Sequence, residues 1–139
     1  MNDLLFQYLS AGRTRLITGW AGHLAPAGSD PAAYVQTATQ GFDGLVHSLH
    51  DPQGEVFHAY IERVVKPWLR IGTPVSDLQR GAEALAVLIH ADIDATVGDR
   101  ADRFHLHKQL TARLRAAYAA WDVAAVQVAM ERFAARGGL

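Results

Sequence analysis

Apolar residues between Glu55 and Val97 recur at helical spacing and predict two consecutive helices. In the first half they form adjacent pairs that recur every four residues: Val56/Phe57, Tyr60/Ile61, Val64/Val65 and Trp68/Leu69. In the second half the residues expected to be buried are Val75, Leu78, Ala82, Leu85, Leu88, Ile89 and Ile93. We therefore expect a helical hairpin that forms the folding core and on which the other helices pack.

The turn of this hairpin is predicted from three consecutive residues. Gly72 can end the first helix in a left-handed conformation, Thr73 can cap the second helix, and Pro74 fits its first turn. Pro67 has no N–H to donate, so it should kink the first arm or begin the final turn of that arm.

Two further helices are predicted before the hairpin. The first spans residues 3–23, although it contains three glycines that lower its intrinsic stability. The second begins at Asp30, a good N-cap residue, with Pro31 in its first turn, and ends near His50. With the last helix, the prediction is an all-α fold: a single bundle of about five helices over residues 1–139.

The last helix should begin after Gly98, with Asp99 or Asp102 as its cap, and run nearly to Arg136. Two apolar stripes lie on roughly opposite sides of it. The first stripe is Leu114, Tyr118, Trp121, Ala125 and Val128. The second is Ala116, Ala120, Val123, Val126 and Met130. Because a surface helix needs one apolar stripe for its own core, the second stripe predicts a homodimer interface.

Composition narrows the class of protein. The chain has 139 residues, half of them apolar and 19% charged, which is typical of one globular domain. Thirteen basic and fourteen acidic residues give no field that would attract nucleic acid. The absence of cysteine excludes disulfides, thiolate nucleophiles and Cys-ligated zinc. No stretch approaches 18 unbroken apolar residues and the first apolar run is short for a signal peptide, so we expect a cytoplasmic protein without membrane association.

Seven histidines raise the possibility of a metal site. Helical bundles do bind metals through His and carboxylate side chains one turn apart. A structural site needs about four ligands and a catalytic site three, and no Glu-x-x-His or His-Glu-x-x-His pattern occurs. We therefore predict no metal, with a helical metalloenzyme using His and Asp ligands as an alternative. The pairs considered are His47 with His50, His90 with Asp94, and His105 with His107.

His90 is also the candidate for a haem ligand, because it lies at the edge of an apolar helical face. A histidine in this position is more often a satisfied core residue, so no cofactor is predicted and a globin-type haem sensor is the alternative. Trp20, Trp68 and Trp121 each lie on an apolar stripe. We expect them to anchor the core, with a ligand pocket as the less common use of such residues.

No catalytic residue is predicted. Ser10, Ser29, Ser48 and Ser76 lie in no nucleophile-elbow pattern. The segment Gly41-Phe42-Asp43-Gly44 lies inside an amphipathic helix and follows no strand, so it is not expected to form a phosphate loop. The sequence is therefore not expected to encode an enzyme.

The segment IERVVKPWLRIGTPVSDLQRGAEALAVLI, residues 61–89, resembles the amino-terminal domains of stressosome co-antagonists of the RsbR type and related input domains of bacterial sensor kinases. The parts that carry the likeness are Leu69-Arg70-Ile71-Gly72, Thr73-Pro74-Val75 and Leu78-Gln79-Arg80. Residues 4–20 are similar to the first helix of that family, although Thr18-Gly19-Trp20 lacks its basic residue. Residues 110–135 resemble its exit helix, so the likeness spans almost the whole chain.

This resemblance implies a globin-like helical fold without haem, dimerisation through the terminal helices, and signal input to an attached output domain. It brings no catalytic residues with it. The chain ends at Leu139 with no phospho-acceptor or kinase domain, so we expect either a fragment of a longer signalling protein or a stand-alone domain with a protein partner. The predicted function is a non-catalytic sensory or protein-interaction input domain of a bacterial signalling or stress-response system.

Overall fold

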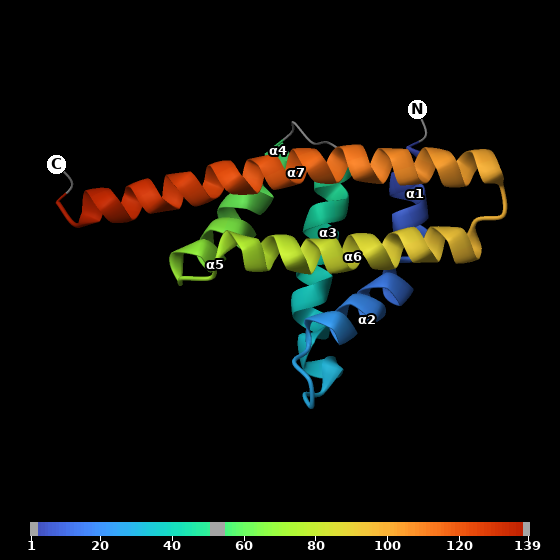
Figure 1. Ribbon diagram of the computed structural model, residues 1–139, viewed down its shortest axis with the longest axis horizontal. Helices are drawn as coiled ribbons and strands as arrows, with labels where there is room; N and C mark the ends of the chain where they lie inside the picture. The colour runs from blue at the N-terminus through green and yellow to red at the C-terminus, as the bar shows by residue number, and fades with distance from the viewer. Residues whose placement is uncertain (1–2, 51–54, 138–139) are drawn as a thin grey trace.

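The computed structural model describes residues 3–50 and 55–137, and every regular element in them is helical (Figure 1). The predicted all-α fold class is confirmed. The elements are α1 (Leu4–Ala11), α2 (Arg13–Leu24), the 3₁₀ helix η1 (Pro31–Tyr34), α3 (Val35–His50), α4 (Glu55–Tyr60), the π-helix η2 (Ile61–Val65), α5 (Lys66–Arg70), α6 (Val75–Thr96) and α7 (Arg100–Ala135).

The two longest helices, α6 and α7, run side by side in opposite directions, and α1 and α3 cross behind them (Figure 1). The Asp99 side chain caps α7 by accepting a hydrogen bond from the N–H of Asp102 at 2.9 Å, as predicted. Along α7, buried residues recur every three or four positions: Leu106, Leu110, Leu114, Ala117, Trp121, Ala124 and Val128. One face of α7 is therefore committed to the core along most of its length.

The prediction of one continuous helix over residues 3–23 is wrong. The Asp3 side chain caps α1 at the N–H of Phe6, but α1 ends at Ala11 and a new helix begins at Arg13. Gly12 between them leaves the helical conformation, with φ −93° and ψ 9°. Glycine resists helix formation, and the break lets the buried residues of α1 and of α2 approach the core from two directions.

The main core is formed by α1, α2, α3, α6 and α7. Its largest fully buried side chains are Phe42, Leu5, Leu9, Leu16, Leu85, Ile89, Ile93, Leu106 and Leu110. A smaller cluster joins the other elements to α6 and α7: Ile61, Val65, Leu69, Ala82, Trp121, Ala124 and Val128. The prediction that the hairpin of residues 55–97 forms the centre of the fold is therefore wrong. Its first arm packs on α3 and α7, whereas α6 packs on α2 and α7.

This arrangement changes the expected burial of the hairpin. In α6, Ala82, Leu85, Ile89 and Ile93 are buried as predicted, whereas Val75, Leu78 and Leu88 are only partly buried. Trp68, expected as a core anchor, keeps 42% of its surface exposed. The reason is that the face of the first arm turned to α6 and α7 carries Ile61, Val65 and Leu69 instead. The side chain of Val56 lies outside the described residues.

In the turn between the two arms, the predicted conformation of Gly72 is confirmed and the predicted cap of α6 is wrong. Gly72 has φ +100°, the left-handed conformation predicted for it. Thr73 does not cap α6: Pro74 is the N-cap residue, without a side-chain hydrogen bond, and α6 begins at Val75. The N–H of Thr73 instead donates to the carbonyl of Trp68 at 3.1 Å and so belongs to the end of α5.

Pro67 lies in the first turn of α5, in agreement with its predicted place in the last turn of this arm. It follows the π-helix η2, in which the N–H of Lys66 donates a hydrogen bond to the carbonyl of Ile61, five residues earlier. Because proline has no N–H, the regular helical bonding pattern cannot continue through this position. Wider π-turns of this kind often accompany functional sites.

Candidate functional site

A cavity of about 310 Å³ opens between α2, α3, the first arm of the hairpin, α6 and α7. Five aromatic residues contribute to its wall: Trp20, Tyr34, Tyr60, Trp68 and Trp121. Aliphatic side chains such as Leu24, Leu45 and Val64 fill the spaces between them. We call this space the aromatic cavity. All three tryptophans that were predicted to lie on apolar stripes therefore come together here.

Trp20 is fixed in the wall by contacts with two helices. Its indole Nε1 donates a hydrogen bond to the carbonyl of Gly81 on α6 at 2.9 Å. On the α3 side, a Cβ atom at Gly41 would lie 3.0 Å from Cη2 of the Trp20 ring, so the ring uses space that only glycine leaves free.

Tyr60 is held in a similar way by the other glycine of the segment 41–44. A Cβ atom at Gly44 would come within 2.7 Å of Cε2 of the Tyr60 ring, far closer than ordinary van der Waals contact. Burial raises the pKa of the Tyr60 hydroxyl to about 12, so the phenol remains neutral at physiological pH. Gly41 and Gly44, one helical turn apart, therefore set the positions of two aromatic walls.

Trp121 and Trp68 form walls of different character. Trp121 is buried on the inner face of α7 and packs against Tyr118 with a centroid distance of 5.6 Å. Its buried indole Nε1 has no hydrogen-bond partner among the described residues. Trp68, in contrast, lies at the edge with much of its ring exposed. The cavity thus has a rigid interior and an open aromatic edge.

The electrostatic character of the aromatic cavity is close to neutral. Among the described residues that line it, Asp77 is the only charged one, and its carboxylate is paired with the guanidinium of Arg80. The remaining polar groups of the wall are neutral amide and hydroxyl side chains such as Gln40 and Thr37. An arrangement of this kind can bind by burial and ring stacking and offers few groups for acid–base chemistry.

The second apolar stripe of α7 lies on the opposite side of this helix from the core. Val123, Val126 and Met130 expose 58%, 59% and 65% of their surfaces, and Ala116 is exposed as well. Ala120 is partly buried and packs against the smaller core cluster, so its predicted place on the outer face is wrong. We call the exposed residues Ala116, Val123, Val126 and Met130 the outer stripe. Phe133, which lies beyond the predicted stripe, is also exposed and extends it toward the end of α7.

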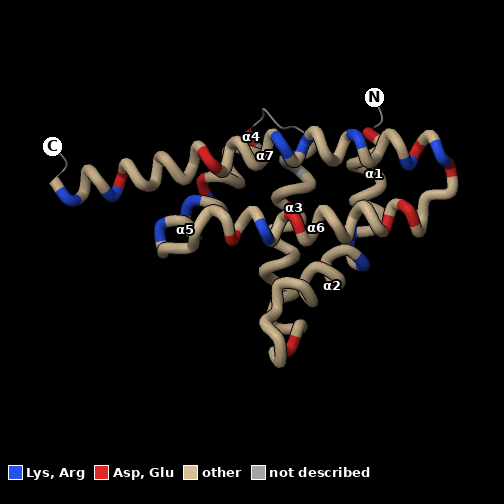
Figure 2. Tube along the Cα trace, viewed as in Figure 1, with Lys and Arg blue, Asp and Glu red and all other residues tan. Residues whose placement is uncertain are grey.

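Few charges interrupt this region of α7 (Figure 2). Between Ala116 and Met130 the sequence contains one charged residue, Asp122. Its carboxylate accepts a hydrogen bond from the side chain of Gln79 on α6 at 2.9 Å, which turns it away from the outer stripe. The stripe is therefore an apolar surface without a charged residue of its own.

The structure brings His90 and Asp94 together through His107, a partner that was not predicted for them from the sequence. The two imidazole rings stack with a centroid distance of 4.8 Å, and their Nδ1 atoms are 2.6 Å apart. His107 Nε2 lies 2.8 Å from a carboxylate oxygen of Asp94. Burial, and then the charge of His107, lowers the pKa of His90, while Asp94 opposes the shift. Haem ligation through Nδ1 of His90 would require this contact to break.

Of the other histidines considered, His105 does not join this group. His105 is exposed on α7. The side chains of His47 and His50 lie outside the described residues. Among the residues that are described, no set of three or more His, Asp or Glu side chains is arranged to hold a metal ion. His90 is also absent from the wall of the aromatic cavity.

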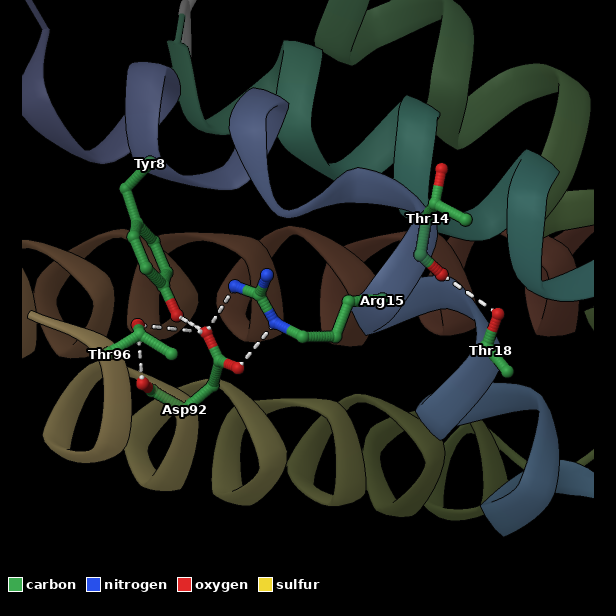
Figure 3. A network of polar contacts seen from close by, with 6 residues as sticks. All are labelled: Tyr8, Thr14, Arg15, Thr18, Asp92 and Thr96. Carbon is green, nitrogen blue, oxygen red and sulfur yellow. Dashed lines mark hydrogen bonds and ion pairs between the residues drawn. The ribbon is translucent and has the colours of Figure 1, made fainter.

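A polar network ties the first two helices to α6 (Figure 3). Arg15 on α2 makes two hydrogen bonds to the carboxylate of Asp92, at 2.7 and 2.8 Å, and the Tyr8 hydroxyl from α1 donates to the same carboxylate. The bonds from Arg15 hold the pKa of Asp92 below its ordinary value. Burial, and then the contact with Asp92, raises the pKa of Tyr8. We interpret the network as a clamp that positions α1 and α2.

None of the helices in the described part of the chain combines the length and apolar character needed to cross a lipid bilayer. Comparison of the chain with protein-family models, with curated proteins and with solved structures finds no match. The likeness to stressosome input domains and the globin-like arrangement therefore stay predictions.

Proposed function

We propose that this chain is a non-enzymatic sensory or protein-interaction input domain that acts as a homodimer through the outer stripe of α7. The observation that carries the proposal is the exposure of this stripe on a helix whose other face is already buried in the core. The resemblance of residues 61–89 to stressosome and sensor-kinase input domains suggests the bacterial signalling or stress-response setting and an output protein as the further partner.

The physical argument for a second copy begins with the cost of leaving the stripe in water. Burying apolar surface contributes about 25 cal/mol per Å², so adjacent exposed Val, Met and Phe side chains favour association. A two-fold axis would set the same stripe of two molecules face to face. Ala116, at one end of the stripe, is small enough to let the two helices approach closely there.

The same helix offers a connection between the interface and the interior. Trp121 lines the aromatic cavity, and Val123, two residues later, lies on the outer stripe. A shift of α7 at the cavity would therefore move the interface as well, because both faces belong to one rigid helix. This geometry supports an input role for the domain and requires no catalytic group.

Light scattering on the full chain tests the proposal. We expect the wild type to have twice the chain mass of 15.1 kDa. Val123→Glu would bury two like charges near the two-fold axis, so it should yield a monomer with unchanged helix content by circular dichroism. The matched control is Val87→Glu, at a site on α6 that is 70% exposed and lies outside the stripe, and it should remain dimeric. A monomeric wild type, or a Val123→Glu variant that unfolds, would contradict the proposal.

A further inference from the structure

We propose that the aromatic cavity is a binding site for a small, neutral, flat molecule, such as a one- or two-ring aromatic compound. This inference goes beyond the proposed interface and does not depend on dimerisation. It rests on how the walls are held, on the volume and chemistry that they enclose, and on the exposed tryptophan at the edge.

The first step is that the walls are fixed before any ligand arrives. The Trp20 indole is bonded to the carbonyl of Gly81 and rests on the backbone of α3 at Gly41. The Tyr60 ring rests on the same helix at Gly44. Neither ring can move toward α3 without meeting its backbone, and the hydrogen bond to Gly81 holds Trp20 from the side of α6 as well. Ligand sites are usually preformed in this way.

The second step concerns the volume. About 310 Å³ lies at the lower end of the range of roughly 300–1,000 Å³ that is usual for small-molecule sites. A water molecule occupies about 30 Å³ in the liquid and needs two to four polar partners, which aliphatic and aromatic walls do not supply in number. The space therefore suits an apolar molecule of one or two rings better than a chain of water molecules.

The third step concerns charge and shape. Asp77 is neutralised by Arg80, so the wall offers no unpaired charge to a cation or an anion. Rings from α2, α4, α5 and α7 surround the space, and aromatic pairs gain about 0.5–1.5 kcal/mol beyond simple burial when they stack or meet edge to face. These walls therefore favour a flat, uncharged ligand.

The fourth step is the exposed edge. Trp68 leaves much of its indole in solvent, next to the opening of an apolar space. Its ring is not required to close the core, since Leu69 and Val65 occupy that role in the same arm. A flat ligand that entered the cavity would cover the exposed part of this ring. Trp68 can thus be altered with less damage to the fold than the buried walls.

The neutral two-ring fluorophore 6-propionyl-2-dimethylaminonaphthalene serves as the probe, because its emission rises and shifts to shorter wavelength in apolar surroundings. Titrated into the full chain, it should give a saturable increase with one site per chain. Val64→Phe places a ring in the cavity and should weaken binding at least tenfold, whereas the matched control Val87→Phe, on the exposed face of α6, should leave it unchanged. Trp68→Ala should weaken binding, whereas Phe104→Ala, an exposed aromatic residue on α7 outside the cavity, should not.

Further measurements distinguish the aromatic cavity from a binding site elsewhere on the chain. Binding that survives in Val123→Glu and is lost in Val64→Phe supports the cavity; binding lost only in Val123→Glu would place the probe on the outer stripe and overturn the proposal. Indole should displace the probe, whereas displacement by choline but not by indole would show a cation site instead. Absence of saturable binding to the wild type would also overturn it. If Val64→Phe fails to fold by circular dichroism, Trp68→Ala with its Phe104→Ala control decides the matter.

Discussion

The ring of Tyr60, the last residue of α4, lies against the backbone of Gly44 in α3, so closely that a Cβ atom at position 44 would approach Cε2 to 2.7 Å. This contact explains a glycine inside an amphipathic helix, where its flexibility would otherwise be unfavourable by about 1 kcal/mol relative to alanine. It also joins the first arm of the hairpin to α3 and sets one wall of the aromatic cavity.

Gly44→Ala should therefore destabilise the protein. The gain of about 1 kcal/mol in helix propensity is opposed by a steric clash with the Tyr60 ring, and overpacking of this kind costs about 1–3 kcal/mol. Gly22→Ala is the matched control, because a Cβ atom there meets nothing within 4 Å and should stabilise α2 by about 0.5–1 kcal/mol. Urea unfolding followed by circular dichroism measures both. Equal stabilisation by the two changes would show that Tyr60 does not rest on Gly44.

The elements that could be predicted from sequence are those with strong local signals. The last helix is an example: a capping Asp99, no proline or glycine before Gly137, and two apolar stripes indicated its bounds and its two faces. The break at Gly12 could not be predicted, because Gly19 and Gly22 carry the same intrinsic penalty and remain helical in α2. Packing of α1 and α2 on different parts of the core decides which glycine ends a helix.

The candidate site was predictable only in part. The predicted apolar stripes placed Trp20 and Trp121 on buried faces correctly and Trp68 wrongly, and a stripe cannot show whether its residues fill a core or enclose a space. The neighbours of the first arm are α3 and α7, and this long-range pairing is what leaves Trp68 at an edge. The sequence signal for the cavity was the pair of glycines at 41 and 44, whose lack of side chains makes room for rings from other elements.

Leu85 and Trp68 should respond very differently to truncation. Leu85 is fully buried in the main core, and Leu85→Ala is expected to cost about 2–5 kcal/mol. Trp68→Ala removes a ring that is already partly in solvent, so its cost should be clearly smaller than that of Leu85→Ala. Thermal unfolding of both variants tests the comparison. A loss for Trp68→Ala as large as that for Leu85→Ala would restore Trp68 as a core anchor.

The clamp at Asp92 predicts an acid-dependent contribution to stability. The Asp92 carboxylate accepts two hydrogen bonds from Arg15 and one from Tyr8, and Asp92→Asn removes the negative charge that strengthens them. We expect this change to lower the free energy of unfolding by about 1 kcal/mol, after allowance for solvent screening at the exposed Arg15. Because the folded pKa of Asp92 is lowered, this contribution is present above the unfolded pKa of about 3.9 and is lost as the pH falls through the folded value.

The free energy of unfolding of wild type and Asp92→Asn should therefore differ at pH 7, and the difference should be smaller at pH 3, below the unfolded pKa of about 3.9. Asp43→Asn is the control, because Asp43 makes a similar two-bond contact with Arg13 at a more exposed site, where the loss at pH 7 should be smaller. Urea unfolding at the two pH values measures these differences. A gap between wild type and Asp92→Asn that stays constant down to pH 3 would argue against the charged clamp.

His90 should make the protein less stable as the pH falls below neutrality. The folded pKa of His90 lies below its ordinary value, chiefly because of burial, so the unfolded chain binds the proton more readily. The contribution of His90 to the free energy of unfolding is then fully present above its unfolded pKa of about 6.5. It decreases as the pH falls from there toward the folded pKa, by at most about 1.4 kcal/mol per pH unit.

The contact with His107 gives this effect a structural basis. Two Nδ1 atoms 2.6 Å apart need one donor and one acceptor, so the two rings cannot both be protonated at Nδ1 without losing the bond. The carboxylate of Asp94 lies 2.8 Å from Nε2 of His107 and partly opposes the effect of burial on the pKa of His90. A protonated His90 would add a positive charge to this partly buried contact between α6 and α7, where burial disfavours it.

Urea unfolding at pH 7.5 and pH 5 tests this prediction with His90→Gln, which has no proton to gain in this range. The loss of stability between the two pH values should be smaller in His90→Gln than in the wild type. The control His105→Gln removes an exposed histidine of α7 and should keep the wild-type loss. If His105→Gln reduces the pH dependence as much as His90→Gln does, the effect does not arise from the contact between His90 and His107.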